Sequence, residues 1–495
     1  MQLKDILRHI PTLKIEGPLD REVTGITYDS RRLTPGMIFV AIPGHNVDGH
    51  QFISNAIDRG AAAVICESNG FVSRRATKVK VSDSREALAR AAAIFYQHPS
   101  AKLKVIGVTG TNGKTTVAFI IKQILEVSGL RCGLIGTVRY EIGDRVIPAH
   151  RTTPEALEIQ QMMAQMARTG CGACVMEVSS HALDQKRVAE IEFDVALFTN
   201  LTRDHLDYHG TMDAYYLAKR QLFQSRAASG KSRTAVINID DAYGERLHRE
   251  SDLEVQLTYG LNEKAVLRAT ELELGRDSTR MVIHCSRGKI PCKLNLIGRH
   301  NVYNALAAVG AALALDVPSD VITRALESMP SVPGRLETIH RGQPFGVFVD
   351  YAHTDDALQN VLVTLRELTR GRLLLVFGCG GSRDMGKRPR MGRVAAELAD
   401  FSLITSDNPR KESPATIAAQ VEQGFREVRQ DGYRIELDRR RAIDEIIRMA
   451  HPEDLVLIAG KGHETYQEFE DTVIPFDDRV HAGETLETMG YQEAF

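Results

Sequence analysis

Short apolar runs alternate with amphipathic helical segments along most of the chain. The alternation is clearest from residue 101, which opens with the run KVIGVTG, and it resumes at about residue 333. The strands expected in this last part are GVFVDYAH, RLLLVFGCGG, FSLITSDNPR and DLVLIAGKG. Buried apolar strands separated by amphipathic helices are typical of parallel sheets covered on both faces. The pattern therefore predicts an α/β protein with doubly wound sheets.

Changes in this pattern predict three domains. Residues 1–100 hold short β and α segments and end in the linker YQHPSAKL, so we expect a smaller N-terminal α/β domain. Residues 101–332 form a central domain with a mostly parallel sheet and two hairpins, which turn at Gly143-Asp144 and near Arg287-Gly288. Residues 333–495 form a C-terminal, doubly wound, Rossmann-like domain.

Composition excludes several classes of protein. Hydrophobic residues make up 43% and charged residues 25% of the chain, and the net charge is −2, so nothing favours a nucleic-acid or membrane surface. The N-terminus lacks the apolar core of a signal peptide, and no apolar run reaches the length of a membrane span. Seven scattered cysteines form no disulfide framework, and the pair Cys171 and Cys174 fits a strand better than a metal site. We expect a cytoplasmic protein.

The run VIGVTGTNGKTTVAFIIKQIL carries the sharpest local motif. A strand ends in a glycine-rich loop and a helix begins at once, an arrangement in which backbone N–H groups surround phosphate oxygens. Val108 stands where the full motif has its first glycine, so this is a variant. The central domain is thus predicted to be a P-loop-type ATPase domain. Its predicted loop residues are Gly110, Thr111, Asn112, Gly113, Lys114, Thr115 and Thr116.

Two further strand ends offer partners for a nucleotide and Mg²⁺. Glu177 lies near the end of the apolar run CVMEV, and beside a phosphate loop a carboxylate there favours a role at the metal. The next strand leads into DHLDYHG, which reads as a loop and places His205 near the same edge. Lys219 lies on the following helix, and composition alone would make it a solvated surface lysine.

A turn near the C-terminus combines both signs of charge. An apolar strand over residues 401–405 leads into Asp407, Asn408, Pro409 and Arg410. The alternative to a binding site is a helix cap and turn with a chance ion pair. Parallel strands deliver ligand-binding residues at their carboxyl ends, where GCGGSRD and AGKGHE also emerge.

The order of motifs resembles the Mur ligase family over essentially the whole chain. The motifs are YDSRRLTPGMIFVAIPGHNVDGH, VTGTNGKTT, MEVSSH, TNLTRDHLDYHG, GRHNVYNALAA, PGRLE, VDYAHT, GCGGSRD and AGKGHETYQ. Within the family, the chain is most similar to the enzymes that add the third residue of the peptidoglycan stem peptide. The resemblance implies an ATP-dependent acid–amino-acid ligase that uses Mg²⁺. Its implied substrates are ATP, UDP-N-acetylmuramoyl-L-alanyl-D-glutamate and meso-diaminopimelate, and we expect it to act as a monomer.

The resemblance also implies roles for individual residues. Lys114, Glu177, His205 and Lys219 would be catalytic, and Thr115, Glu177, His205 and Lys219 would hold metal, with Lys219 carboxylated. Besides the loop, the implied ATP contacts are Asn301, Asn304, Arg335 and Asp350. The implied sugar-peptide contacts are Tyr28, Ser30, His45, Asn46, Val47, Arg151, Thr152, Thr153, Ser179, Gln185 and Arg187. The implied diaminopimelate contacts are Arg383, Asp407, Asn408, Pro409, Arg410, Gly460 and Glu464.

Some positions leave alternatives open. Arg151, Asp355 and Ser382 depart from the residues usual in the family, Ser30 could be a turn residue, and Arg187 could be a structural ion-pair partner. L-lysine could replace diaminopimelate as the added amino acid, although it offers no second carboxylate to Arg410. A folate-polyglutamate ligase would share the ATP site. From other classes, an ATPase switch or a small-molecule kinase would form no amide.

Overall fold

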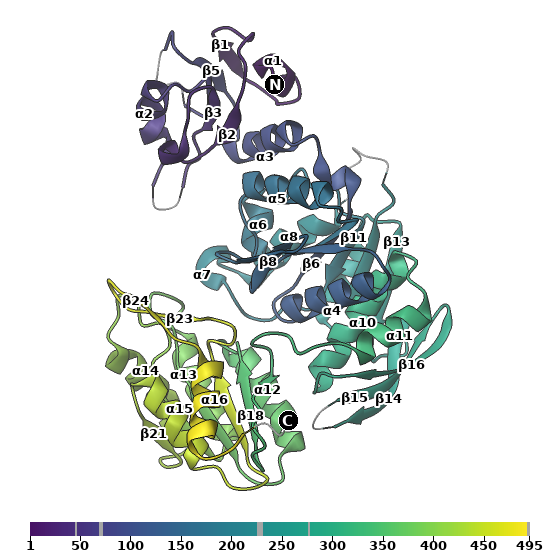
Figure 1. The fold of residues 1–495 in the computed structure, drawn as a ribbon, viewed down its shortest axis with the longest axis vertical. Coiled ribbons are helices and arrows are strands. Elements are labelled where there is room, and N and C mark those ends of the chain that lie inside the picture. Colours follow the sequence, from purple (N-terminus) through teal and green to yellow (C-terminus); the bar gives the residue numbers. More distant parts are fainter. Residues whose placement is uncertain (45–46, 69–72, 225–230, 276–277, 493–495) are drawn as a thin grey trace.

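Three bodies are stacked along the long axis of the molecule, in the order of the sequence (Figure 1). The coordinates are a computed structural model that describes residues 1–44, 47–68, 73–224, 231–275 and 278–492. Within these ranges no helix is both long enough and apolar enough to cross a membrane.

The N-terminal body is a sheet in the order β1-β5-β4-β3-β2, parallel except for the edge strand β1. Its strands are β1 (Lys14–Glu16), β2 (Gly25–Thr27), β3 (Met37–Val40), β4 (Ala63–Cys66) and β5 (Thr77–Lys80), with helices α1 (Leu3–Leu7), α2 (Ile53–Asp58) and α3 (Ser84–Phe95). Short 3₁₀ turns lie at Ser30–Arg32, Gly49–Phe52 and Pro99–Lys102. Ile38 and Val40 pack into one hydrophobic cluster and Phe39 into another, so the sheet is buried on both faces.

The central body is built on a sheet in the order β16-β15-β14-β13-β12-β11-β6-β10-β7-β8-β9. The strands from β7 to β14 in this order are parallel, and antiparallel hairpins extend both edges. The first strands are β6 (Lys104–Thr109), β7 (Cys132–Ile135), β8 (Arg139–Ile142), β9 (Arg145–Pro148), β10 (Ala173–Glu177) and β11 (Val195–Phe198). The others are β12 (Thr234–Asn238), β13 (Val255–Gly260), β14 (Leu267–Leu274), β15 (Thr279–Cys285) and β16 (Gly288–Leu294).

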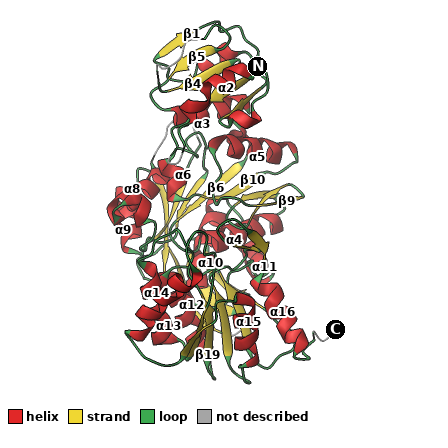
Figure 2. Cartoon of the chain, turned by 90° about the vertical axis from the view of Figure 1, so that its left-hand side faces the viewer, coloured by secondary structure: helices red, strands yellow, loops and turns green. Residues whose placement is uncertain are grey.

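Helices cover both faces of the central sheet (Figures 1 and 2). One face packs against α4 (Lys114–Val127), α10 (Arg299–Ala314) and α11 (Ser319–Glu327). The other packs against α5 (Ala156–Arg168), α6 (Ser180–Asp184), α8 (Met212–Arg220) and α9 (Ala242–Glu250), and a 3₁₀ turn spans Gln221–Phe223. Both predicted hairpins are present, as β8–β9 and β15–β16.

The C-terminal body is a doubly wound sheet in the order β17-β18-β22-β19-β20-β21, parallel except for β17. Its strands are β17 (Glu337–Thr338), β18 (Gly346–Asp350), β19 (Leu373–Phe377), β20 (Phe401–Ile404), β21 (Tyr433–Ile435) and β22 (Leu455–Ala459), and a separate hairpin joins β23 (Tyr466–Glu468) to β24 (Val473–Pro475). One face packs against α12 (Asp355–Leu368), α13 (Lys387–Leu398) and α14 (Pro414–Arg426). The other packs against α15 (Arg439–Arg448) and α16 (Asp478–Thr488), as Figure 2 shows.

The predicted fold class is confirmed by this architecture. Strands β1–β5 lie within residues 1–100, β6–β16 within 101–332 and β17–β24 within 333–495. The domain boundaries themselves stay a prediction. Cys174 is fully buried in β10, as its apolar surroundings predict.

Candidate active site

The glycine-rich loop follows β6 and opens α4, as its sequence predicts. Gly110 and Gly113 have φ angles of 147° and 85°, which favour glycine. A Cβ atom would lie 1.8 Å from the Thr199 hydroxyl at Gly110, and 2.4 Å from the Asn304 side-chain oxygen at Gly113. Val108 is buried inside β6. Glycine is therefore present where close approach requires it, and the departure from the full motif falls within the strand.

Lys114 begins α4 and folds back over the loop. Its Nζ donates hydrogen bonds to the backbone oxygens of Gly110 at 2.9 Å and Thr111 at 2.7 Å. Burial lowers the pKa of Lys114, and the charge of Glu177 acts in the opposite direction. The amine therefore lies against the loop whose backbone N–H groups would receive phosphate oxygens.

Glu177 ends β10 with its carboxylate fully buried. One carboxylate oxygen accepts hydrogen bonds from the hydroxyls of Thr115 and Thr137, each at 3.0 Å, and the other accepts from the backbone N–H of Thr137 at 2.8 Å. A threonine hydroxyl beside a carboxylate is a hard oxygen donor pair of the kind that Mg²⁺ prefers. Thr115 and Glu177 are thus brought together as predicted.

Lys219 is only 2% exposed, so the composition-based expectation of a solvated lysine is wrong. Helix α8 turns it inward, where its Nζ donates to the backbone oxygen of Gly110 at 2.8 Å and lies 4.7 Å from the centre of the Tyr215 ring. Burial lowers its pKa well below the usual value, and repulsion from Lys114 adds to this effect. The 3.6-residue period of α8 that buries Tyr215 also buries Lys219, one turn later.

His205 lies near Lys219 but in a conformation that the sequence does not predict. The segment expected to be a loop contains a one-turn helix, α7 (Leu206–His209), and His205 precedes it with a φ of 54°. The His205 ring lies 6.1 Å from the Tyr215 ring, which Lys219 also contacts, and 4.9 Å from the His181 ring. Burial lowers the pKa of His205 to about 4, so the ring is neutral near pH 7.

A cavity of about 470 Å³ lies beside the loop, between the central and C-terminal bodies. Arg335 donates to the Thr115 hydroxyl at 3.1 Å, and Asp350 accepts from the backbone N–H of Leu336 at 2.7 Å. Asn304 donates to the Asn301 side chain at 2.9 Å. The predicted ATP contacts that line the cavity are Asn112, Gly113, Thr115, Thr116, Asn301, Asn304, Arg335 and Asp350.

The predicted sugar-peptide contacts of the N-terminal body have mixed outcomes. The Tyr28 hydroxyl donates to Glu158 of the central body at 2.8 Å, and Ser30 begins a 3₁₀ turn with 7% exposure. Val47 is 54% exposed. His45 and Asn46 lie outside the described residues.

Four predicted sugar-peptide contacts of the central body form one hydrogen-bonded group, namely Thr153, Ser179, Gln185 and Arg187. Arg187 donates to the backbone oxygen of Thr153 at 2.9 Å and to the Gln185 side chain at 2.6 Å, and it pairs with Glu155 at 3.1 Å. The backbone N–H of Ser179 donates to the Thr153 hydroxyl at 3.0 Å. Arg187 is therefore an ion-pair partner, as the structural alternative held, and it also lies among the proposed substrate contacts.

A second cavity, of about 660 Å³, brings together residues of the predicted sugar-peptide, metal and diaminopimelate groups. It is lined by Arg151 and Thr152 from the sugar-peptide group and by His205 from the metal group. Its acceptor-group residues are Arg383, Asp407, Asn408, Arg410, Gly460 and Glu464. One cleft between the central and C-terminal bodies thus joins two predicted substrate sites to the predicted metal site.

The charges at the DNPR turn are already engaged within the protein. Arg410 has a φ of 51° and donates from Nε to Glu468 at 2.8 Å and from Nη1 to the backbone oxygen of Gly381 at 2.9 Å. Asp407 is 6% exposed, and its Oδ2 lies 3.2 Å from the place that a Cβ atom would take on Gly460. The turn therefore presents its charges from fixed positions, in keeping with the proline between them.

Three contacts of this region escape sequence reasoning. Lys461 is fully buried and donates to Asn408 and Glu464 at 3.0 Å each, whereas a lysine between two glycines is typical of a solvated turn. Glu468 forms an ion pair with Arg410, and the hydrophobic pattern of neither segment predicts this contact. Asp356, on α12, accepts from Asn112 of the phosphate loop at 2.7 Å and so connects two domains.

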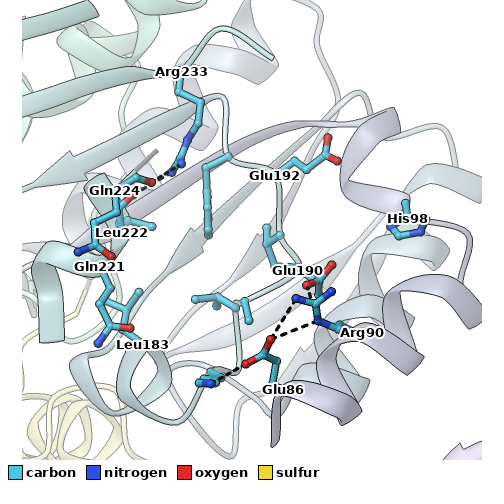
Figure 3. A pocket seen from close by; sticks show the side chains of 15 residues that line it. Glu86, Arg90, His98, Leu183, Glu190, Glu192, Gln221, Leu222, Gln224 and Arg233 are labelled. Atoms are coloured by element: carbon cyan, nitrogen blue, oxygen red, sulfur yellow. Dashed lines mark hydrogen bonds and ion pairs between the residues drawn. The ribbon is translucent and has the colours of Figure 1, made fainter. Parts of the chain in front are cut away.

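A third cavity, of about 490 Å³, lies between α3 and the central body (Figure 3). Its wall carries Glu86, which accepts from Arg90 at 3.0 Å and from Lys186 at 2.6 Å. None of the predicted site residues lines it. The cavity belongs to the contact between the first two bodies rather than to the candidate active site.

Comparison with known families accounts for most of the chain. Residues 22–96 match the Mur ligase family catalytic domain, residues 108–312 the Mur ligase middle domain, and residues 334–462 the Mur ligase glutamate ligase domain. The three matches fall one in each of the three predicted domains.

Full-length relatives agree with these matches. A UDP-N-acetylmuramoyl-L-alanyl-D-glutamate–2,6-diaminopimelate ligase from Syntrophomonas wolfei is 46% identical, covering 98% of this chain and 99% of the relative. A protein of the same name from Solibacter usitatus is 44% identical, with 100% of both chains covered. A solved structure with that name is 33% identical, with a TM-score of 0.72 and coverage of 99% of this chain and 100% of the other.

Proposed function

Because the chain belongs to the Mur ligase family, we propose that it joins meso-diaminopimelate to UDP-N-acetylmuramoyl-L-alanyl-D-glutamate, using ATP, in peptidoglycan precursor synthesis. The relatives at 44–46% identity carry the name of this reaction. The observation that carries the proposal is the cleft of about 660 Å³, where Arg410 and two acidic side chains face the residues assigned to the sugar peptide.

The reaction needs an activated carboxylate, since a free carboxylate resists attack by an amine at neutral pH. ATP transfers its γ-phosphoryl group to the D-glutamate carboxylate and gives an acyl phosphate. The amine of the acceptor attacks its carbonyl carbon, and the tetrahedral intermediate expels phosphate and forms the amide. Lys114 and the loop N–H groups hold the phosphates, and Arg335 adds a positive charge beside Thr115.

The donor set of Thr115 and Glu177 fits one Mg²⁺ ion. Within the described ranges no group of three His, Cys, Asp or Glu side chains gathers around one point, so phosphate oxygens would complete the coordination. Bound Mg²⁺ would neutralise charge on the phosphates as the two anions approach each other. Glu177 is held ready for this role by its hydrogen bonds to Thr137.

A second metal position would require chemical modification of Lys219. An ammonium group is no metal ligand, but a carboxylated lysine is an anionic oxygen donor. Lys219 is buried against the loop and beside Lys114, where its pKa is lowered well below the usual value. Carbon dioxide reacts with a neutral amine, so this environment supports carboxylation. His205, neutral near pH 7, would then complete the position with a ring nitrogen.

The acceptor would bind at the carboxyl ends of β19, β20 and β22. Arg410 and Arg383 would receive a carboxylate of diaminopimelate, and Asp407 and Glu464 would receive an ammonium group. L-lysine offers no second carboxylate, so Arg410 favours diaminopimelate. We also expect the protein to be cytoplasmic, on the composition of the chain, and to act as a monomer.

Phosphate release with Mg-ATP and the UDP-sugar dipeptide tests the proposal, with meso-diaminopimelate, L-lysine or no amino acid added. We expect release that depends on diaminopimelate and is matched by amide product. Release with lysine instead would keep the ligase and refute the assignment of Arg410. Phosphate release that does not depend on the added amino acid would identify an ATPase. A stable phosphorylated product without amide would identify a kinase.

A further inference from the structure

The acceptor site contains an ammonium group of its own. Lys461 follows β22 and is fully buried. Its Nζ lies 3.0 Å from the side-chain oxygen of Asn408, 3.0 Å from a carboxylate oxygen of Glu464 and 3.7 Å from a carboxylate oxygen of Asp407. The two carboxylates that would receive the acceptor ammonium are therefore already in contact with a protein cation.

The Lys461 charge offsets one of these two negative charges. Burial raises the pKa of Glu464, the Lys461 charge lowers it, and the charge of Asp407 raises it again. Two buried carboxylates so close together would otherwise favour uptake of a proton by one of them. With Lys461 in place the three groups carry one net negative charge, which matches a single ligand ammonium.

Lys461 also fixes the direction of the neighbouring amide. The Asn408 oxygen accepts from Lys461 and from the backbone N–H of Glu468 at 2.9 Å, so the Asn408 NH₂ group turns to Glu464 and donates at 2.9 Å. One oxygen of Glu464 thus receives both internal hydrogen bonds. The second oxygen is the one that a ligand ammonium would approach.

We propose that Lys461 is a positioning residue for the acceptor, an internal counter-ion that holds Asp407 and Glu464 correctly oriented for one ammonium group of the incoming amino acid. The proposal rests on the proposed ligase activity, because it assigns a role within that acceptor site. A purely structural lysine would affect the stability of the turn and the binding of all three substrates alike.

The experiment compares Lys461→Ala and Lys461→Gln with the wild-type enzyme in full steady-state kinetics. We expect the KM for diaminopimelate to rise about 10- to 100-fold, since hydrogen bonds to charged groups are lost, while the KM for ATP changes less than about 2-fold. Lys411→Ala is the control, because it removes an exposed lysine beside Arg410, in the loop that follows β20. It should leave both constants unchanged.

Chemical rescue separates a missing ammonium from a damaged fold. Methylammonium should lower the raised diaminopimelate KM of Lys461→Ala, whereas tetramethylammonium, which has no N–H donor, should not. A normal diaminopimelate KM in both variants would overturn the proposal, and so would equal losses for ATP and diaminopimelate without rescue. If phosphate release by the wild-type enzyme did not depend on diaminopimelate, the ligase assignment would be overturned, and this inference with it.

Discussion

The proposed nucleotide site and the proposed acceptor site differ in how their charged side chains are paired. Among the described residues, Lys114, Lys219 and Arg335 donate to backbone or hydroxyl oxygens and form no ion pair. In the acceptor site Arg410 is paired with Glu468, and Lys461 lies against Glu464 and Asp407. The basic side chains of the first site thus lack direct ion pairs among the described residues, whereas the charges of the second site already pair with one another.

This difference matches the ligands that the two sites would take. Triphosphate is a polyanion, and it offsets the repulsion between Lys114 and Arg335 when it binds. A diamino acid is a zwitterion, and its carboxylate and ammonium groups must bind to side chains that already form ion pairs with one another. Loss of a buried ionisable side chain should therefore be severe in the nucleotide site, whereas changes in the acceptor site should affect selectivity more than turnover.

Lys219→Ala should produce the largest effect. We expect kcat to fall roughly 100- to 1,000-fold, the range found when one electrostatic group is removed from a reaction centre. The measurement is diaminopimelate-dependent phosphate release. Formate should partly restore turnover if the missing group is a carboxylated lysine, and methylammonium should do so if it is an ammonium. Wild-type turnover in the variant would contradict any role for Lys219.

Arg410→Lys should have a smaller and more selective effect. Lysine keeps the charge but loses the planar fork and the hydrogen bonds to Glu468 and Gly381. We expect the diaminopimelate KM to rise about 10- to 100-fold, with kcat and the ATP KM little changed. An unchanged KM for diaminopimelate would show that the guanidinium does not bind the acceptor, and the contrast between the two sites would then fail.

Gly113→Ala tests whether the nucleotide site depends on close backbone approach. Gly129 is a matched control, since it has a φ of 86° against 85° for Gly113 and no atom within 4 Å of the place that a Cβ atom would take. Both alanines would adopt a positive φ, but only the one at residue 113 meets Asn304. We expect about a 10-fold weaker ATP affinity at residue 113, or about 1.4 kcal/mol, and little change at residue 129. The measurement is the affinity of each variant for ATP by calorimetry. Equal ATP affinities of the two variants would contradict the prediction.

The nucleotide site was the easier of the two to predict. Its loop is a continuous run whose function follows from backbone geometry, and Glu177 follows from the rule that parallel strands end at one edge. The role of Lys219 follows only from the family resemblance, because one polar residue on a helix does not indicate which other elements bury it. The helix α7 was missed since four residues carry no measurable period.

The acceptor site could be predicted only in part. DNPR can be recognised in the sequence because an acidic residue, an amide, a proline and an arginine are consecutive. Its partners Lys461 and Glu468 lie more than fifty residues later, and their pairing depends on how three loops meet at the end of a sheet. Such contacts come from tertiary packing, which the pattern of a single segment does not specify.

Glu468→Gln should have the smallest effect. It tests whether the pairing of Arg410 with Glu468 hinders or helps the binding of a zwitterionic acceptor. The Arg410–Glu468 pair is partly exposed, with side-chain exposures of 22% and 37%, and such pairs contribute about 0.2–1 kcal/mol. If Glu468 occupies the Nε of Arg410 in competition with the acceptor carboxylate, the variant should lower the diaminopimelate KM by up to about 5-fold. If Glu468 instead holds the guanidinium in place, the KM should rise by a similar factor. We expect the decrease, because the bond to Gly381 still orients Arg410 in the variant. An increase measured beside an unchanged ATP KM would reverse this assignment and make the internal pair a part of the acceptor site rather than its competitor.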